Sequence, residues 1–268
     1  MNARRAFQRA LVVACIGMTA VGDAKASASD LTKEVHVESY RPIYTNDWRS
    51  GIGDIEIQAV RPSDVMLAAD PADPARRSIR VHIQKSENFT NLINGSPRAE
   101  FTLPRDVVFS PGHDYLILWR TYLPRDFALD GQQMEIITQI HQSGLTGSPP
   151  FMLTLLGNEY TFSVRGGTNT AHGFGGRLCC ASDDRGKWVD WALQYTPDAS
   201  GEHAITRLWK NGTSVFEGSG KPNAYPGDVR AYLKFGVYKP DWQKEPSDID
   251  AITLYFGKVV IGDRKSRR

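Results

Sequence analysis

The chain has 268 residues, of which 41% are hydrophobic, 10% aromatic and 23% charged, and its formal net charge is +2. This composition is typical of a globular protein. It excludes a disordered chain, which would lack the apolar residues that offset conformational entropy, and it excludes collagen, a coiled coil and a polytopic membrane protein. So small a net charge gives no reason to expect a nucleic-acid partner.

Residues 1–28 have the pattern of an export signal. Three arginines at the start precede an uncharged apolar run, and small residues at alternate positions follow it. The apolar run is too short to span a bilayer comfortably, and the whole arrangement is that of a secretory signal peptide. We therefore expect a periplasmic or secreted protein with no membrane partner. Processing as a lipoprotein at Cys15 is the less favoured alternative, because the apolar stretch before that cysteine is short.

The remainder of the chain reads as a series of short β-strands. Runs with alternating or continuous apolar character are separated by Gly, Pro, Asn and Asp, and Asn211-Gly212 between two such runs is a strong hairpin signal. No sustained helical stripe of apolar residues is visible in this region. We therefore predict an all-β fold, a sandwich or jelly roll, in a single domain over residues 29–268. The expected strands include 78–84, 115–123, 134–141, 151–156, 160–165, 188–195, 204–210, 231–238 and 252–261.

The two cysteines of the mature chain, Cys179 and Cys180, are adjacent. Neighbouring cysteines rarely bridge, since the geometry is strained, so we expect no disulfide on which the fold depends. The sequence contains no C-x-x-C or Cys/His spacing of the kind that holds structural zinc. We assign no residue to a metal ion.

Three of the expected strands carry polar or titratable side chains at alternate positions. They are Arg98 and Glu100, then Gln139 and His141, then Lys234, Gly236 and Tyr238. Residues two apart share a face of a strand, and the apolar residues between them would face the core. If the three strands lie in one sheet, an arginine, an amide, an imidazole, an ammonium and a phenol share one surface. Gly236 would leave room there for a ligand to approach the backbone.

The motifs R-x-E, Q-I-H and Y-x-K-x-G-x-Y, in this order, resemble those of polysaccharide lyases of β-jelly-roll type. These are the alginate lyases with the same motifs and the related glucuronan-lyase and heparin-lyase-I-like families. The resemblance covers about residues 40–262 and implies a concanavalin-like jelly roll of two antiparallel sheets. Alginate lyases usually continue R-x-E into another Arg, whereas Phe101-Thr102-Leu103 follows here. This departure argues against alginate as the substrate more than against lyase chemistry.

The resemblance implies β-elimination from a uronic-acid polysaccharide, which leaves a 4,5-unsaturated uronate end. Charge builds on the sugar carboxylate as the proton on carbon five is removed, and Arg98 and Gln139 would stabilise it. His141 and Tyr238 are the candidates for base and acid. Where the proton and the leaving oxygen lie on the same side of the ring, Tyr238 could serve as both. Where they lie on opposite sides, His141 would be the base and Tyr238 the acid.

Four further residues are expected to bind substrate. Lys234 would add positive charge, Glu100 would hold Arg98 in place, Arg120 would face the same surface, and His172 lies in a glycine-rich segment that could cover the cleft. We expect a monomer that acts on an anionic polysaccharide and requires no cofactor. The resemblance leaves Ca²⁺ open, although we find no dedicated ligand cluster for it.

Two other functions compete with this reading. A jelly-roll protein could bind carbohydrate without catalysis, because a fold does not fix a function. A glycoside hydrolase needs two acids across the scissile bond, and the segment 134–141 offers only Glu135. We therefore disfavour the hydrolase and keep the non-catalytic binding protein as the alternative.

Overall fold

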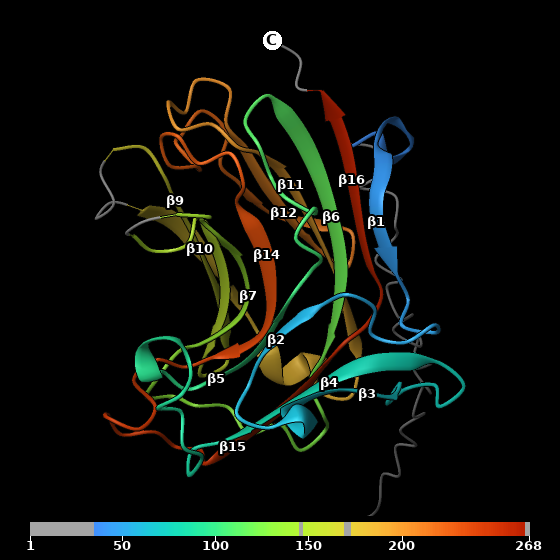
Figure 1. The fold of residues 1–268 in the computed structure, drawn as a ribbon, viewed down its shortest axis with the longest axis vertical. Coiled ribbons are helices and arrows are strands. Elements are labelled where there is room, and N and C mark those ends of the chain that lie inside the picture. Colours follow the sequence, from blue (N-terminus) through green and yellow to red (C-terminus); the bar gives the residue numbers. More distant parts are fainter. Residues whose placement is uncertain (1–34, 145–146, 169–172, 266–268) are drawn as a thin grey trace, which may run out of the picture.

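The computed structural model describes residues 35–144, 147–168 and 173–265, which form two antiparallel β-sheets packed face to face (Figure 1). The all-β sandwich predicted from the sequence is confirmed. The expected export signal, residues 1–28, and the candidate His172 lie outside the described residues.

The larger sheet has nine strands within the described residues. Its order is β13 (Thr213–Glu217), β12 (Ile205–Lys210), β11 (Trp188–Thr196), β6 (His113–Tyr122), β15 (Ala251–Phe256), β4 (Arg77–Gln84) and β3 (Val65–Ala69), with β16 (Val259–Lys265) pairing with β6 and with β1 (Arg41–Asn46).

The smaller sheet has seven strands within the same residues. Its order is β10 (Gly173–Cys179), β9 (Glu159–Arg165), β8 (Phe151–Leu156), β7 (Glu135–His141), β14 (Tyr232–Tyr238), β5 (Arg98–Thr102) and β2 (Glu56–Gln58). The helical elements of the described chain are short 3-10 turns: η1 (Val37–Ser39), η2 (Pro62–Asp64), η3 (Ile93–Gly95) and η4 (Ala181–Asp184). None of the helices in the described ranges has the length and apolar character needed to cross a membrane.

Aromatic side chains fill the space between the sheets. Phe101 on β5 and Phe235 on β14 have ring centroids 5.4 Å apart, and both pack against Phe256 on β15 of the other sheet. All three are fully buried. Because side chains alternate along a strand, this packing turns the neighbouring residues of β5 and β14 to the outward face of the smaller sheet. That face carries the polar residues of the three motifs.

The hairpin predicted at Asn211-Gly212 is confirmed. Both residues have positive φ, 51° and 81°, and they join β12 to β13 through the pair Lys210 and Thr213. An Asn-Gly loop of this kind matches the right-handed twist of the two strands, because both central residues tolerate the left-handed region. The glycine-rich segment behaves differently from the expected loop, since its second half from Gly173 forms edge strand β10.

The structure contradicts the expectation that the two adjacent cysteines are not bridged. Cys179 and Cys180, at the end of β10, are joined by a disulfide. The peptide bond between them is cis.

Candidate active site

The three motif strands are neighbours in the smaller sheet, with β14 between β7 and β5 (Figure 1). The residues directly opposite one another are Tyr232 with His141, Lys234 with Gln139, Gly236 with Glu100, and Tyr238 with Arg98. The expectation that the three motifs share one sheet is therefore confirmed. The register also shows which side chains are neighbours, and spacing within a single strand cannot predict this.

Glu100 is the centre of a buried network of charges. Its carboxylate accepts hydrogen bonds from Gln139 Nε2 and Lys234 Nζ, each at 2.6 Å, and lies 3.5 Å from Arg98 Nη1. Gln58 on β2 completes the network, because its Oε1 accepts from Lys234 Nζ at 3.0 Å and from Arg98 at 3.5 Å. The structure thus brings four predicted residues together. It adds Gln58, which sequence analysis missed because β2 is too short to show a pattern.

The network has an excess of positive charge. Arg98 and Lys234 contribute two cations and Glu100 one carboxylate, and the three side chains are between 2% and 6% exposed. Burial lowers the pKa of Lys234, while the adjacent Glu100 opposes that shift. Gln139 is also buried, and its Oε1 has no hydrogen-bond partner among the described residues. The amide therefore has an unused acceptor beside a net positive charge.

His141 and Tyr232 form an imidazole–phenol pair on this face. Their ring centroids are 5.4 Å apart. His141 Nδ1 lies 2.8 Å from the carbonyl oxygen of Gln142. A carbonyl only accepts, so Nδ1 carries the proton and Nε2 of the neutral ring is an acceptor. Burial lowers the pKa of His141, and the charge of Lys234 adds to this. Burial, and then the charge of Glu100, raises the pKa of Tyr232. At neutral pH the pair is a free base beside a protonated phenol.

Tyr238 lies at the other end of the network. Its ring stacks on the Arg98 guanidinium, whose Cζ is 4.3 Å from the ring centroid. Arg98 also donates to the carbonyl of Ile93 at 3.1 Å. Tyr238 is six residues from Tyr232 on the same strand, so at about 3.3 Å per residue it is on the order of 15–20 Å from the His141 row. The structure does not place Tyr238 beside His141; the phenol there is Tyr232. In the sequence, Tyr232 could have been recognised from its position two residues before Lys234, which places both on the same face of the strand.

Gly236 has a different role from the one expected. A Cβ at this position would lie 2.2 Å from the carbonyl oxygen of Ala99 and 2.6 Å from Cα of Glu100, and its φ is +136°. The glycine is required because β5 approaches closely and because other residues rarely adopt this backbone conformation. The space it leaves is occupied by the backbone of β5.

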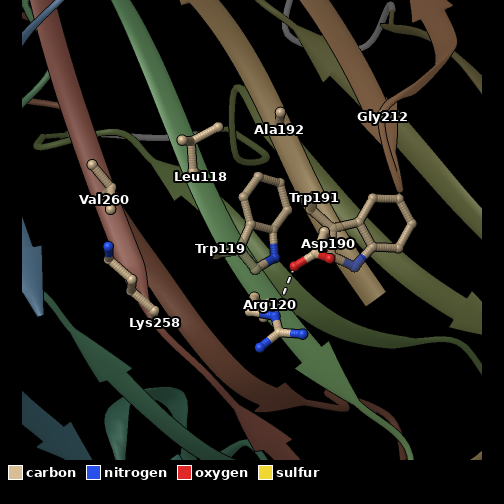
Figure 2. Close-up of a pocket in the computed structure, with 9 residues that line it drawn as sticks. All are labelled: Leu118, Trp119, Arg120, Asp190, Trp191, Ala192, Gly212, Lys258 and Val260. Carbon is tan, nitrogen blue, oxygen red and sulfur yellow. Dashed lines mark hydrogen bonds and ion pairs between the residues drawn. The ribbon is translucent and has the colours of Figure 1, made fainter. Parts of the chain in front are cut away.

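Arg120 was expected on the same surface, but the structure places it in the larger sheet. It follows the core residue Trp119 on β6, so its side chain faces away from the smaller sheet. Its Nε donates to Asp190 Oδ1 at 2.7 Å, and its guanidinium lies over the Trp188 ring. Arg120 and Asp190, joined by that hydrogen bond in Figure 2, are among the residues that line a cavity of about 270 Å³ on that sheet. Arg120 is therefore not part of the network around Glu100.

A second cavity, of about 230 Å³, opens beside Tyr232 on the smaller sheet. Strands β2, β5 and β14 contribute to it, together with the segment that follows β5. Two arginines, Arg105 and Arg230, line it with Thr102 and Ser143. This cavity gives the imidazole–phenol pair an adjoining concave surface with basic residues.

Calcium has no evident site in the part of the chain that the structure describes. No group of three or more His, Cys, Asp or Glu side chains is placed there to hold a metal ion.

Comparisons with known proteins identify the family. The model of a family described as polysaccharide lyase matches residues 45–260. Among solved structures, the endo-β-1,4-glucuronan lyase from the fungus Trichoderma reesei is 14% identical, with 83% of this chain and 95% of that chain covered and a TM-score of 0.65. An alginate lyase from Pseudomonas aeruginosa is 18% identical, with 76% and 87% covered and a TM-score of 0.51.

Likeness of fold alone would not separate an enzyme from a binding domain. The binding domain of botulinum neurotoxin serotype C1 also matches, with 11% identity, 84% of this chain and 48% of that chain covered, and a TM-score of 0.53. A search of the curated proteins found no match. The structural likenesses establish the jelly-roll fold. The family model spans most of the chain and establishes the family: the chain belongs to the polysaccharide lyase family.

Proposed function

We propose that this polysaccharide lyase cleaves a uronic-acid-containing polysaccharide by β-elimination, and that His141 and Tyr232 transfer the protons. The pairing of an imidazole and a phenol at 5.4 Å, on one sheet face with a positively charged network, carries the proposal. A lyase of this kind needs a base, an acid and donors for a carboxylate, and the face supplies all three.

The reaction balances with these groups alone. His141 Nε2 takes the proton from carbon five, and the C–H electron pair becomes the double bond between carbons four and five. The bond from carbon four to the glycosidic oxygen breaks, and that oxygen takes the phenolic proton of Tyr232. The excess positive charge around Glu100 stabilises the charge that develops on the sugar carboxylate.

The stereochemistry of the substrate decides how the pair is used. A proton and a leaving oxygen on opposite sides of the ring match His141 as base and Tyr232 as acid. For groups on the same side, Tyr232 would serve as both base and acid, with a doubly protonated His141 donating from Nε2 to the carboxylate. The lowered pKa of His141 and the raised pKa of Tyr232 support the first assignment.

Tyr238 remains the alternative acid. It shares the face with Tyr232 but stacks on Arg98 at the far end of the network. Adjacency to His141 favours Tyr232, so Tyr238 is better suited to hold Arg98. The two assignments of the acid therefore predict different effects of substitution at Tyr232 and at Tyr238.

The test measures the ultraviolet absorbance of the new carbon–carbon double bond on polyuronates and glycosaminoglycans. We expect His141→Ala and Tyr232→Phe each to lower kcat by at least about 100-fold, which is typical of the loss of a general acid or base. Tyr238→Phe should retain most of the activity. Circular dichroism of each variant checks the fold. Full activity in Tyr232→Phe with loss in Tyr238→Phe would move the acid to Tyr238. Binding with no unsaturated product from any polymer would indicate a carbohydrate-binding protein instead.

We further propose that the protein is exported and acts as a monomer on an anionic polysaccharide. The pattern of residues 1–28 supports export. Sequencing of the mature N-terminus from the producing cell, together with its mass in solution, tests both statements.

A further inference from the structure

The cavity that Tyr232 lines extends from β14 over β5 and β2, and Ser143, two residues after His141, also lies on its wall. Thr102 on β5 is opposite Lys234, and Glu56 on β2 is opposite Thr102. Neighbouring strands are about 4.8 Å apart, so the part of the cavity lined by Thr102 and Glu56 lies about one to two strand spacings beyond Tyr232. A polysaccharide that crosses the strands with one sugar at His141 and Tyr232 would therefore place a neighbouring sugar in this cavity.

The two arginines that line the cavity, Arg105 and Arg230, differ in their partners. The Arg105 guanidinium is paired with the carboxylate of Glu56. Arg230 Nη2 donates to the backbone carbonyl of Arg105 at 3.0 Å. In the ranges that the structure describes, the Arg230 guanidinium has no ion pair, while the Asp228 carboxylate accepts a hydrogen bond from the backbone N–H of Arg230 at 3.2 Å. Arg230 is exposed and lines the cavity, so it is a cation available to an incoming anion.

We propose that this cavity is a second uronate subsite, in which Arg230 binds the carboxylate of the sugar next to the one that is cleaved. The inference rests on the proposed function. A planar guanidinium binds a carboxylate through two parallel hydrogen bonds, and a neutral sugar would leave it without a partner. The substrate is therefore a polymer with uronates at consecutive positions. Polymers that alternate a uronate with a neutral hexosamine fit this cavity less well.

Calorimetry in a His141→Ala background tests the proposal, because an inactive chain binds oligosaccharides without consuming them. The ligands are a saturated polyuronate oligosaccharide and the same oligosaccharide with its carboxyl groups methyl-esterified. Arg230→Met keeps the apolar stem and removes the charge, while Arg230→Lys restores the charge. Arg207→Met is the matched control, since Arg207 lies on β12 of the other sheet and is paired with Glu217.

We expect Arg230→Met to weaken binding of the acidic oligosaccharide at least about tenfold, as loss of a charged hydrogen-bond partner does. Binding of the ester should not change, Arg230→Lys should recover part of the loss, and Arg207→Met should alter neither ligand. Equal weakening of acid and ester, or no weakening, overturns the proposal.

Activity separates this inference from the proposed function. An unsaturated product in the active enzyme, together with unchanged binding in Arg230→Met, removes the subsite and leaves the lyase. Binding that depends on Arg230, with no product from any polymer, removes the lyase and leaves the subsite. Absence of binding to every polyuronate overturns both.

Discussion

Glu100 offers the sharpest test of the buried network. Glu100→Gln replaces a carboxylate by a neutral amide of the same shape and leaves the ammonium of Lys234 and the guanidinium of Arg98 without their anion. Both cations are at most 6% exposed. Breaking a buried ion pair by removing one partner typically costs about 3–5 kcal/mol. The remaining amide oxygen still accepts one hydrogen bond, so we expect the free energy of unfolding to fall by about 3 kcal/mol, the lower end of this range. The total free energy of unfolding of a protein domain is typically about 5–15 kcal/mol, so this loss would be readily measurable.

Urea denaturation at neutral pH measures this loss, with an unchanged slope showing that the two-state comparison is valid. Asp190→Asn is the matched control, because the pair of Asp190 with Arg120 is largely exposed and should contribute less than about 1 kcal/mol. Adding Lys234→Met to Glu100→Gln removes one unpaired cation and should recover stability, with a coupling of about 1–3 kcal/mol. A cost for Glu100→Gln no larger than that for Asp190→Asn would refute the argument.

Three other consequences can be measured directly. A general base acts only when it is unprotonated, and burial lowers the pKa of His141. We therefore expect kcat/KM to fall as the pH decreases, with a midpoint below 6.5. A midpoint above 6.5 would contradict the environment described for this ring. Gly236→Ala should lower the free energy of unfolding by at least about 2 kcal/mol, since its Cβ would strike the carbonyl of Ala99, and an unchanged denaturation midpoint would refute this. Lys239→Met should lower the free energy of unfolding by about 3–5 kcal/mol, because the fully buried ammonium pairs with the buried carboxylate of Asp130 at 2.8 Å and the substitution leaves that charge unpaired. A Tm equal to that of the wild type would count against this.

The sequence predicted the fold class well because the signals are local. Alternating apolar residues and an Asn-Gly turn indicate strands and a hairpin without knowledge of distant partners. The same reasoning placed Arg98, Gln139 and Lys234 on the outward faces of their strands, where the structure has them. It failed for Arg120, because alternation along a strand says nothing about which of two sheets the strand joins.

The choice between the two phenols of Y-x-K-x-G-x-Y shows the limit more closely. Tyr232 lies two residues before Lys234 and Tyr238 lies four residues after it. Both are therefore expected on the same face as Lys234, and the motif alone does not distinguish them. Their partners depend on the register of β14 against β7 and β5, which puts Tyr232 opposite His141 and Tyr238 opposite Arg98. Register is set by long-range pairing and by turn lengths, and neither can be read from one strand.

The register also explains how one short strand serves both structure and chemistry. Towards the core, Phe235 of β14 packs against aromatic rings from both sheets and fixes the strand in place. Towards the outward face, Lys234 is tied to Glu100 by a buried ion pair, so its ammonium cannot move without a cost in stability. Donors fixed in this way need no reorganisation when charge develops on a substrate, which is the condition under which they stabilise a transition state more than a ground state. The rigidity of β14 and the catalytic use that we propose for its outward face therefore depend on the same contacts.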